Sequence, residues 1–149
     1  MNEEKTKLIK FDKRQNQKAS FNFLGFTFYW GRSNNGYKIP KMKTQGSRMR
    51  AKLKNVKVWA KSVRHKGDSK EIWRAFCKKL QGHIQYYGVS HNTERVSTFI
   101  HHAKGIMLYW LNRRSQKKSF NWGAFTCFIE MNPVPKVKIY HQLFQTHSQ

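Results

Sequence analysis

From residue 21 to about residue 43, apolar residues recur at every second position, which is typical of a β-strand. The run over 21–30 follows this period and predicts a strand with apolar side chains on both faces. Residues 31–36 are rich in Asn and Gly and predict a turn, and residues 37–43 are the expected return strand. Pro40 has no backbone N–H, so the return strand is expected at a sheet edge. The pattern therefore predicts one β-hairpin. One face of its first strand carries Leu24, Phe26, Phe28 and Trp30.

Further along the chain, the apolar spacing changes to steps of three and four residues, which predicts amphipathic helices. The first helix is expected to begin at Ser47 and to be closed by Gly67. The second is expected to begin at Asp68, which has capping-box spacing to Glu71, and to end at Gly88. Their apolar stripes are Met49, Leu53, Val56, Ala60 and Val63 in the first, and Ile72, Trp73, Phe76, Leu80, Ile84 and Tyr87 in the second.

A third helix is predicted from Asn92 or Thr93, and a short fourth helix from Ser119 to a stop at 132–133. Their inward positions are Val96, Phe99, Ile100, Ala103, Met107, Trp110 and Leu111, and then Phe120, Phe125, Phe128 and Ile129. These elements predict an α+β fold, in which an N-terminal β-hairpin precedes a mostly helical bundle of three to four helices. The expected units are 1–45, 46–135 and a loose C-terminal tail, 136–149.

Charge narrows the class of partner. The chain has 30 Lys and Arg against seven Asp and Glu in 149 residues, a formal net charge of +23. Aromatic residues make up 15% of the sequence, which is too many for a basic disordered tail. A folded surface this positive repels itself unless a polyanion neutralises it, and nucleic acid is the most abundant polyanion.

Cations gather in three places, and in two of them they are interleaved with aromatic residues. A basic stripe follows the apolar stripe of the first helix, one residue on, and comprises Arg50, Lys54, Lys57, Lys61 and Arg64. Residues 78–88 and 109–122 mix lysine and arginine with tyrosine and tryptophan. Ammonium groups bind phosphates, whereas aromatic and guanidinium planes stack on unpaired RNA bases. A solvated face for the stripe, and core packing for Tyr87, Trp110 and Trp122, are the alternatives.

The sequence gives little support for a catalytic centre or for a membrane-spanning segment. The acidic residues are scattered, whereas two-metal phosphoryl transfer needs converging carboxylates. Cys77 and Cys127 have no CxxC partner and are predicted to be small buried residues, as in a reducing compartment. Neither a signal-peptide core nor a run of about 18 apolar residues is present. We therefore expect a cytoplasmic protein with no catalytic residues, metal, cofactor or membrane span.

Four segments resemble, in family order, the reverse transcriptase/maturases encoded by group II introns. Residues 2–11 resemble the sixth reverse-transcriptase block, and 21–26 the seventh, at the base of the palm. Residues 80–89 resemble the maturase-specific signature, and 110–122 the C-terminal helices of the family. The Tyr-Ala-Asp-Asp block of the family's polymerase centre does not occur here, nor do the paired cysteines of its endonuclease.

The resemblance implies the end of a palm followed by a thumb and maturase domain. It implies a module that binds group II intron RNA and assists its folding and splicing, without polymerising. The RNA-binding residues we expect are Arg50, Lys54, Lys57, Lys61, Arg64, Lys78, His83, Tyr86, Arg113, Arg114, Lys117 and Lys118.

Two other functions stay open at this point. The chain could be the thumb of a split or truncated reverse transcriptase whose catalytic half is an upstream fragment, or it could be an inactive remnant that folds poorly. The remnant is favoured if the face with Phe26 and Phe28, which the family's palm would cover, is left exposed. A membrane-surface role is less favoured, because the apolar stripes are better explained by packing against one another.

Overall fold

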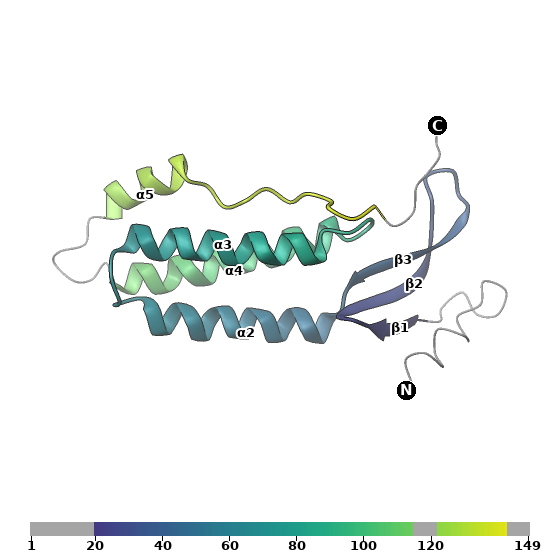
Figure 1. Ribbon diagram of the computed structural model, residues 1–149, viewed down its shortest axis with the longest axis horizontal. Coiled ribbons are helices and arrows are strands. Elements are labelled where there is room, and N and C mark those ends of the chain that lie inside the picture. The colour runs from purple at the N-terminus through teal and green to yellow at the C-terminus, as the bar shows by residue number, and fades with distance from the viewer. Residues whose placement is uncertain (1–19, 115–121, 143–149) are drawn as a thin grey trace.

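The computed structural model describes residues 20–114 and 122–142, and this part of the chain forms an antiparallel sheet followed by four helices (Figure 1). The predicted α+β fold is confirmed. The strands are β1 (Ser20–Phe23), β2 (Phe26–Arg32) and β3 (Lys38–Thr44), in the order β1-β2-β3. The helices are α2 (Gly46–Val63), α3 (Ser69–Tyr87), α4 (Thr93–Arg114) and α5 (Trp122–Met131).

The strand predicted over 21–30 is two strands, so the expected hairpin is a three-stranded sheet. Leu24 and Gly25 form a two-residue turn between β1 and β2, with φ of 56° and 87°. Positive φ at both positions is typical of a type I′ turn, for which Asn-Gly is preferred over Leu-Gly. Phe21 pairs with Phe28 and stacks on it at 5.0 Å between ring centroids, although the single-strand prediction placed them on opposite faces.

The sheet packs against the helices, so its apolar face is not exposed as expected. Phe26 and Met42 are buried in the same core as the helical stripes, and Phe28 is half-buried against it. The Phe26 ring lies 5.1 Å from that of Tyr87 on α3. Leu24 remains exposed because it lies in the turn. The core therefore crosses the predicted boundary at residue 45.

A buried hydrogen-bond group fixes the end of the sheet to the start of α4. The side-chain oxygen of Asn92 accepts from the Thr44 backbone N–H at 2.7 Å. The Asn92 amide nitrogen donates to Thr44 Oγ1 at 2.8 Å and to the Tyr87 carbonyl at 2.9 Å. Asn92 and Thr44 are both fully buried, so these bonds also satisfy groups that water cannot reach.

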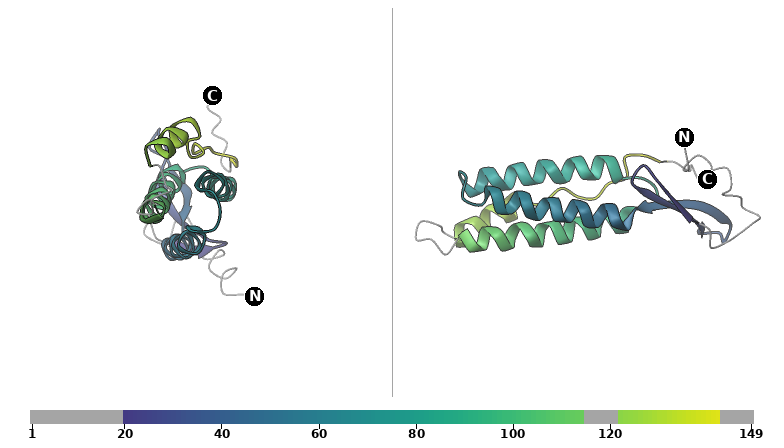
Figure 2. Two further views of the ribbon diagram at one scale, coloured as in Figure 1. Left: turned by 90° about the vertical axis from the view of Figure 1, so that its left-hand side faces the viewer. Right: turned by 90° about the horizontal axis from the view of Figure 1, so that it is seen from below.

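Helices α2, α3 and α4 lie roughly parallel to one long axis, and the view along that axis shows them at the corners of a triangle (Figure 2). Helices α2 and α3 each pack along α4. The predicted inward residues of α3 and α4 are buried, except that Trp110 is half-buried. Asp68 caps α3 as predicted, accepting from the Lys70 N–H, whereas α2 begins at Gly46 after Gln45 rather than at a Ser47 cap.

The segment after α5 runs extended alongside α3 toward the sheet (Figure 1). Trp73 Nε1 donates to the Asn132 carbonyl at 2.7 Å, and the Tyr140 N–H donates to the Gly88 carbonyl at 2.6 Å. The described part of the expected loose tail, 136–142, is therefore docked. In α5, Phe125 is buried as predicted, but Cys127 is exposed, which contradicts its predicted burial. Ser119 and Phe120 lie outside the described residues.

Candidate nucleic-acid interface

Helix α2 presents three different faces along its length. Its apolar stripe packs into the core, and Ala60 is fully buried there. On one side of this stripe lies the basic stripe, of which Arg50, Lys54, Lys57 and Lys61 are exposed and Arg64 is half-buried. The other side, which carries Lys52 and Trp59, faces a second depression between α2 and α3. The predicted orientation of the basic stripe relative to the core is confirmed.

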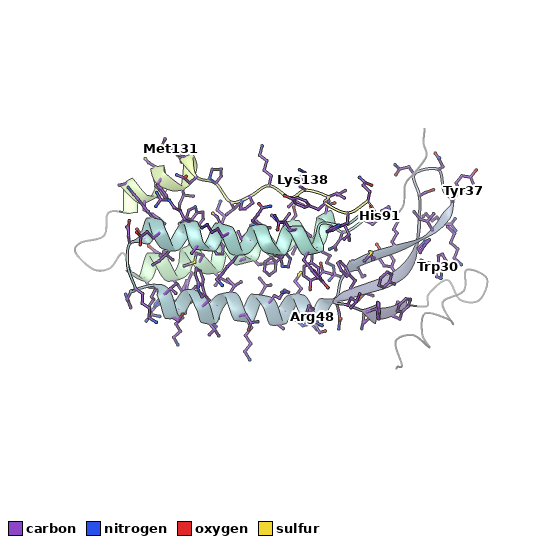
Figure 3. All side chains as sticks on the ribbon, in the orientation of Figure 1. Trp30, Tyr37, Arg48, His91, Met131 and Lys138 are labelled. Carbon is purple, nitrogen blue, oxygen red and sulfur yellow. The ribbon has the colours of Figure 1, made fainter. Side chains whose placement is uncertain are left out.

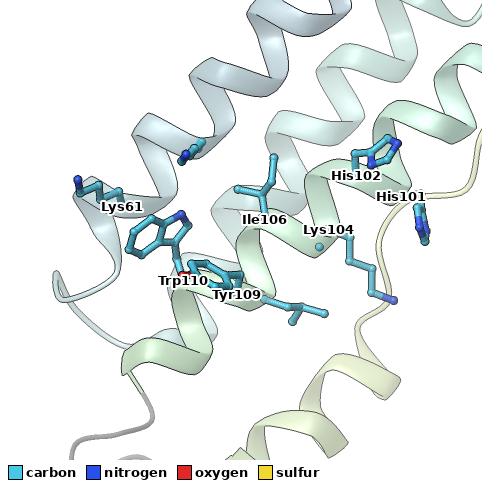
Figure 4. Close-up of a pocket in the computed structure, with 10 residues that line it drawn as sticks. Lys61, His101, His102, Lys104, Ile106, Tyr109 and Trp110 are labelled. Atoms are coloured by element: carbon cyan, nitrogen blue, oxygen red, sulfur yellow. The ribbon is translucent and has the colours of Figure 1, made fainter.

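An open cavity of about 900 Å³ lies where the basic stripe meets α4. Figure 4 shows Lys61 from α2 beside Trp110 from α4, with His101 and His102 farther along the same helix. Lys57 and Lys104 add further ammonium groups to the lining, and none of the ten lining residues is acidic. The cavity therefore has a positive wall and an aromatic end.

Trp110 is the centre of a cluster of cations. The Arg64 guanidinium carbon lies 4.8 Å from the ring centroid, Lys61 Nζ 5.8 Å and the Arg113 guanidinium carbon 5.6 Å. Arg113 also donates to the hydroxyl of Tyr109 at 3.2 Å. Cations over an indole face are attracted by its quadrupole, so the ring holds three charges that would otherwise repel one another.

The ionisable side chains of the cavity are lysines, a tyrosine and two histidines. Its two histidine rings are exposed and 5.6 Å apart between centroids. Within the described ranges, no group of three or more His, Cys, Asp or Glu side chains could hold a metal ion. The acidic residues in those ranges are Asp68, Glu71, Glu94 and Glu130, and all are exposed.

The residues predicted from the maturase-like signature lie elsewhere. Lys78 is exposed on α3, and Tyr86 is half-exposed and donates to the Leu24 carbonyl at 2.8 Å. His83 is 8% exposed, and its ring stacks on Phe99 at 3.7 Å between centroids. Burial, and to a lesser extent the charge of Lys52, lowers the pKa of His83 to about 4, so its imidazole is neutral at pH 7.

Known proteins give no further guide to this arrangement. Comparison with protein families, curated proteins and solved structures finds no match. None of the helices in residues 20–114 and 122–142 is long and apolar enough to cross a membrane.

The structure brings together part of the predicted RNA-binding set. Lys57 and Lys61 on α2, and Arg64 directly after it, meet Arg113 on α4 around Trp110, although about fifty residues separate them in the sequence. The side chains of Arg114, Lys117 and Lys118 lie outside the described residues. Sequence reasoning missed Trp59 and Lys79, which line the second depression. The signal was present, because Lys52, Val56 and Trp59 are spaced by four and three residues, as are Lys79, His83 and Tyr86.

Proposed function

We propose that this chain is an RNA-binding module that binds structured RNA of the group II intron type and stabilises its fold, while the RNA carries out the splicing chemistry. The observation that carries the proposal is the Trp110 cluster. There, an aromatic ring and cations from two helices border one open, acid-free cavity. The choice of intron RNA rests on the resemblance of the four sequence segments.

The two kinds of side chain have different roles. Lys57 and Lys61 are compact charges that bind backbone phosphates and position the RNA without reading its sequence. Tyr109, which is 54% exposed, and the accessible part of Trp110 offer ring faces to unpaired bases. Arg64 and Arg113 already lie over the indole, so each guanidinium can contact a phosphate while it keeps that ring.

A second candidate is the thumb of a reverse transcriptase that works with a separate catalytic chain. The resemblance of residues 2–11 and 21–26 to palm segments favours it. Primer extension by this chain mixed with an upstream fragment that carries the Tyr-Ala-Asp-Asp block distinguishes the two. An inactive remnant that folds poorly is disfavoured, because Phe26 and Met42 pack within the helical core.

The test is the salt dependence of RNA binding, because released counterions reveal how many phosphates are contacted. We propose the double variant Lys57→Gln/Lys61→Gln, since glutamine and lysine have similar helix propensities. The matched control is Lys136→Gln/Lys138→Gln, which removes the same charge from two exposed positions. Lys138 projects from the far side of the molecule relative to α2 (Figure 3).

The parent chain should bind a structured RNA with an affinity that falls steeply with salt. In the α2 variant, the slope of log affinity against log salt should decrease by about 2, one for each lost phosphate contact. The control should lose less affinity and keep the parent slope. If both variants change the slope equally, binding is a diffuse effect of net charge, and the proposed interface is refuted.

A further inference from the structure

The depression between α2 and α3 is a second open cavity, on the opposite flank of α2 from the Trp110 cluster. It exists because α2 and α3 each pack on α4, and Phe99 of α4 forms part of its floor. Its volume is about 420 Å³, within the range of small-molecule sites. We call it the His83 groove.

The walls of the His83 groove are aromatic and its charges are positive. Trp59 lines it from α2, and Tyr86 and Tyr87 line it from α3. Lys79 Nζ lies 5.0 Å from the centroid of the Trp59 ring, and Lys52 Nζ lies 5.7 Å from that of Tyr87. Each lysine thus reaches across the groove to an aromatic ring on the other helix.

One atom of the groove lacks a partner. His83 Nε2 is buried, and within the described residues nothing hydrogen-bonds to it. Buried polar atoms are almost always paired, because an unpaired one costs about 1–3 kcal/mol in mutational series. His83 is more than nine-tenths buried and lines the cavity, but Nε2 itself has almost no exposed surface. A ligand in the groove would therefore supply the missing bond by displacing the side chains that cover this atom.

We infer that the His83 groove takes an unpaired nucleobase of the bound RNA. A base has two flat faces for aromatic walls, a polar edge for His83 Nε2, and an attached phosphate for Lys52 or Lys79. A neutral imidazole nitrogen either donates or accepts, so His83 can pair with more than one base. A cationic partner would be repelled, since none of the lining residues is acidic. The inference rests on the proposed RNA-binding function and adds the His83 groove as a second place where the protein contacts the RNA.

Gly82 allows the groove to be blocked without damage to the fold. It lies in α3 and lines the groove, and a Cβ added there would meet no atom within 4 Å. Leucine is a better helix former than glycine, so Gly82→Leu should fill the groove and leave the thermal transition unchanged or higher. Ala75→Leu is the control, since Ala75 is exposed on the same helix and lines neither cavity.

The experiment compares two RNA hairpins that are identical except for a single unpaired adenosine in one stem. The parent should bind the bulged hairpin about tenfold more tightly than the paired one, as expected for one stacked base. Gly82→Leu should abolish this preference and leave the affinity for the paired hairpin intact. Ala75→Leu should retain the preference. His83→Phe, which keeps a ring on Phe99 but has no polar atom, should reduce the preference and is the second variant.

The outcomes separate the two proposals. If the parent binds neither hairpin, the proposed function fails. If it binds both equally, or if Gly82→Leu and His83→Phe both keep the preference, RNA binding stands and the groove assignment is wrong. Titration with adenosine monophosphate is a further arm. In one outcome, the parent binds adenosine monophosphate with micromolar affinity, loses this binding in Gly82→Leu, and yet binds both hairpins equally. That combination would overturn the assignment, because the groove would then take a free nucleotide and not a base of the RNA.

Discussion

Protonation of His83 should destabilise the fold, because its neutral ring is held in the interior between Phe99 and Tyr87. The perturbation that tests this is His83→Phe, which preserves a flat ring in the stack and removes the titrating group. In the folded chain the pKa of His83 is lowered from 6.5 to about 4, chiefly by burial. In the unfolded chain the ring is solvated and protonates near pH 6.5.

The sign follows from proton binding. Between pH 6.5 and about 4, the unfolded chain binds a proton at His83 and the folded chain does not, so stability falls as the pH falls. Above pH 6.5 the stabilisation is fully present. From pH 7.5 to pH 4.5, His83 alone should remove about 2–3 kcal/mol from the free energy of unfolding. The charge of Lys52 acts in the same direction as burial.

The assay is urea denaturation, followed by circular dichroism, of the parent and His83→Phe at pH 7.5 and pH 4.5. The parent should lose about 2–3 kcal/mol more than the variant between the two conditions. At pH 7.5, His83→Phe should be at least as stable as the parent, because it removes a buried unpaired nitrogen.

A second histidine supplies the control. The pKa of His91 is also lowered, by its partial burial and then by the charge of Lys41, and its φ of 70° suits asparagine. Between pH 7.5 and pH 4.5, His91→Asn should therefore reduce the loss in free energy of unfolding by less than His83→Phe does, because most of His91 is exposed. Equal pH dependence of the parent and His83→Phe would mean that water reaches the imidazole, and the buried stack would be refuted.

Three further substitutions test the packing by chemical denaturation. Phe26→Ala should cost about 3–5 kcal/mol, because the ring lies in the shared core; a loss below 1 kcal/mol would show that the sheet is not docked. Leu24→Asn should add up to about 1 kcal/mol, because asparagine before Gly25 suits the positive φ of the turn; a loss would contradict the type I′ geometry. Asn92→Ala should cost at least about 2 kcal/mol, because it leaves buried Thr44 groups unpaired; unchanged stability would contradict that network.

The helices were predictable because burial itself sets the period of apolar residues. The stripe of α3 from Ile72 to Tyr87 is buried at each predicted position, since one face of the helix meets the core throughout. The α2 stripe was predictable for the same reason, and the face of its basic stripe followed from the helical rotation. The apolar period of each helix does not depend on which helices pack against it.

Features that depend on which helices and strands pack against one another could not be predicted. Leucine is a poor turn residue, so the turn at Leu24 was concealed in a strongly apolar run, and the sheet was mistaken for a hairpin. Cys127 shares an apolar segment with Phe125, but α5 is short and buries only part of its surface. The meeting of Arg64 with Trp110 and the gap between α2 and α3 depend on how helices are placed in space.

Asn92 has a consequence for the far end of the molecule. It precedes α4, and the helix rises about 1.5 Å per residue, so Trp110 lies about 27 Å from it along the axis. A slip of α4 by one residue would rotate Trp110 by about 100° and remove it from Lys61 and Arg64. The amide of Asn92, bonded to the sheet at Thr44, holds the start of α4 in place, and together with the buried stripe of the helix it sets the axial register of α4. The alignment of the cation cluster thus depends in part on the opposite end of α4, on a side chain that touches none of its members.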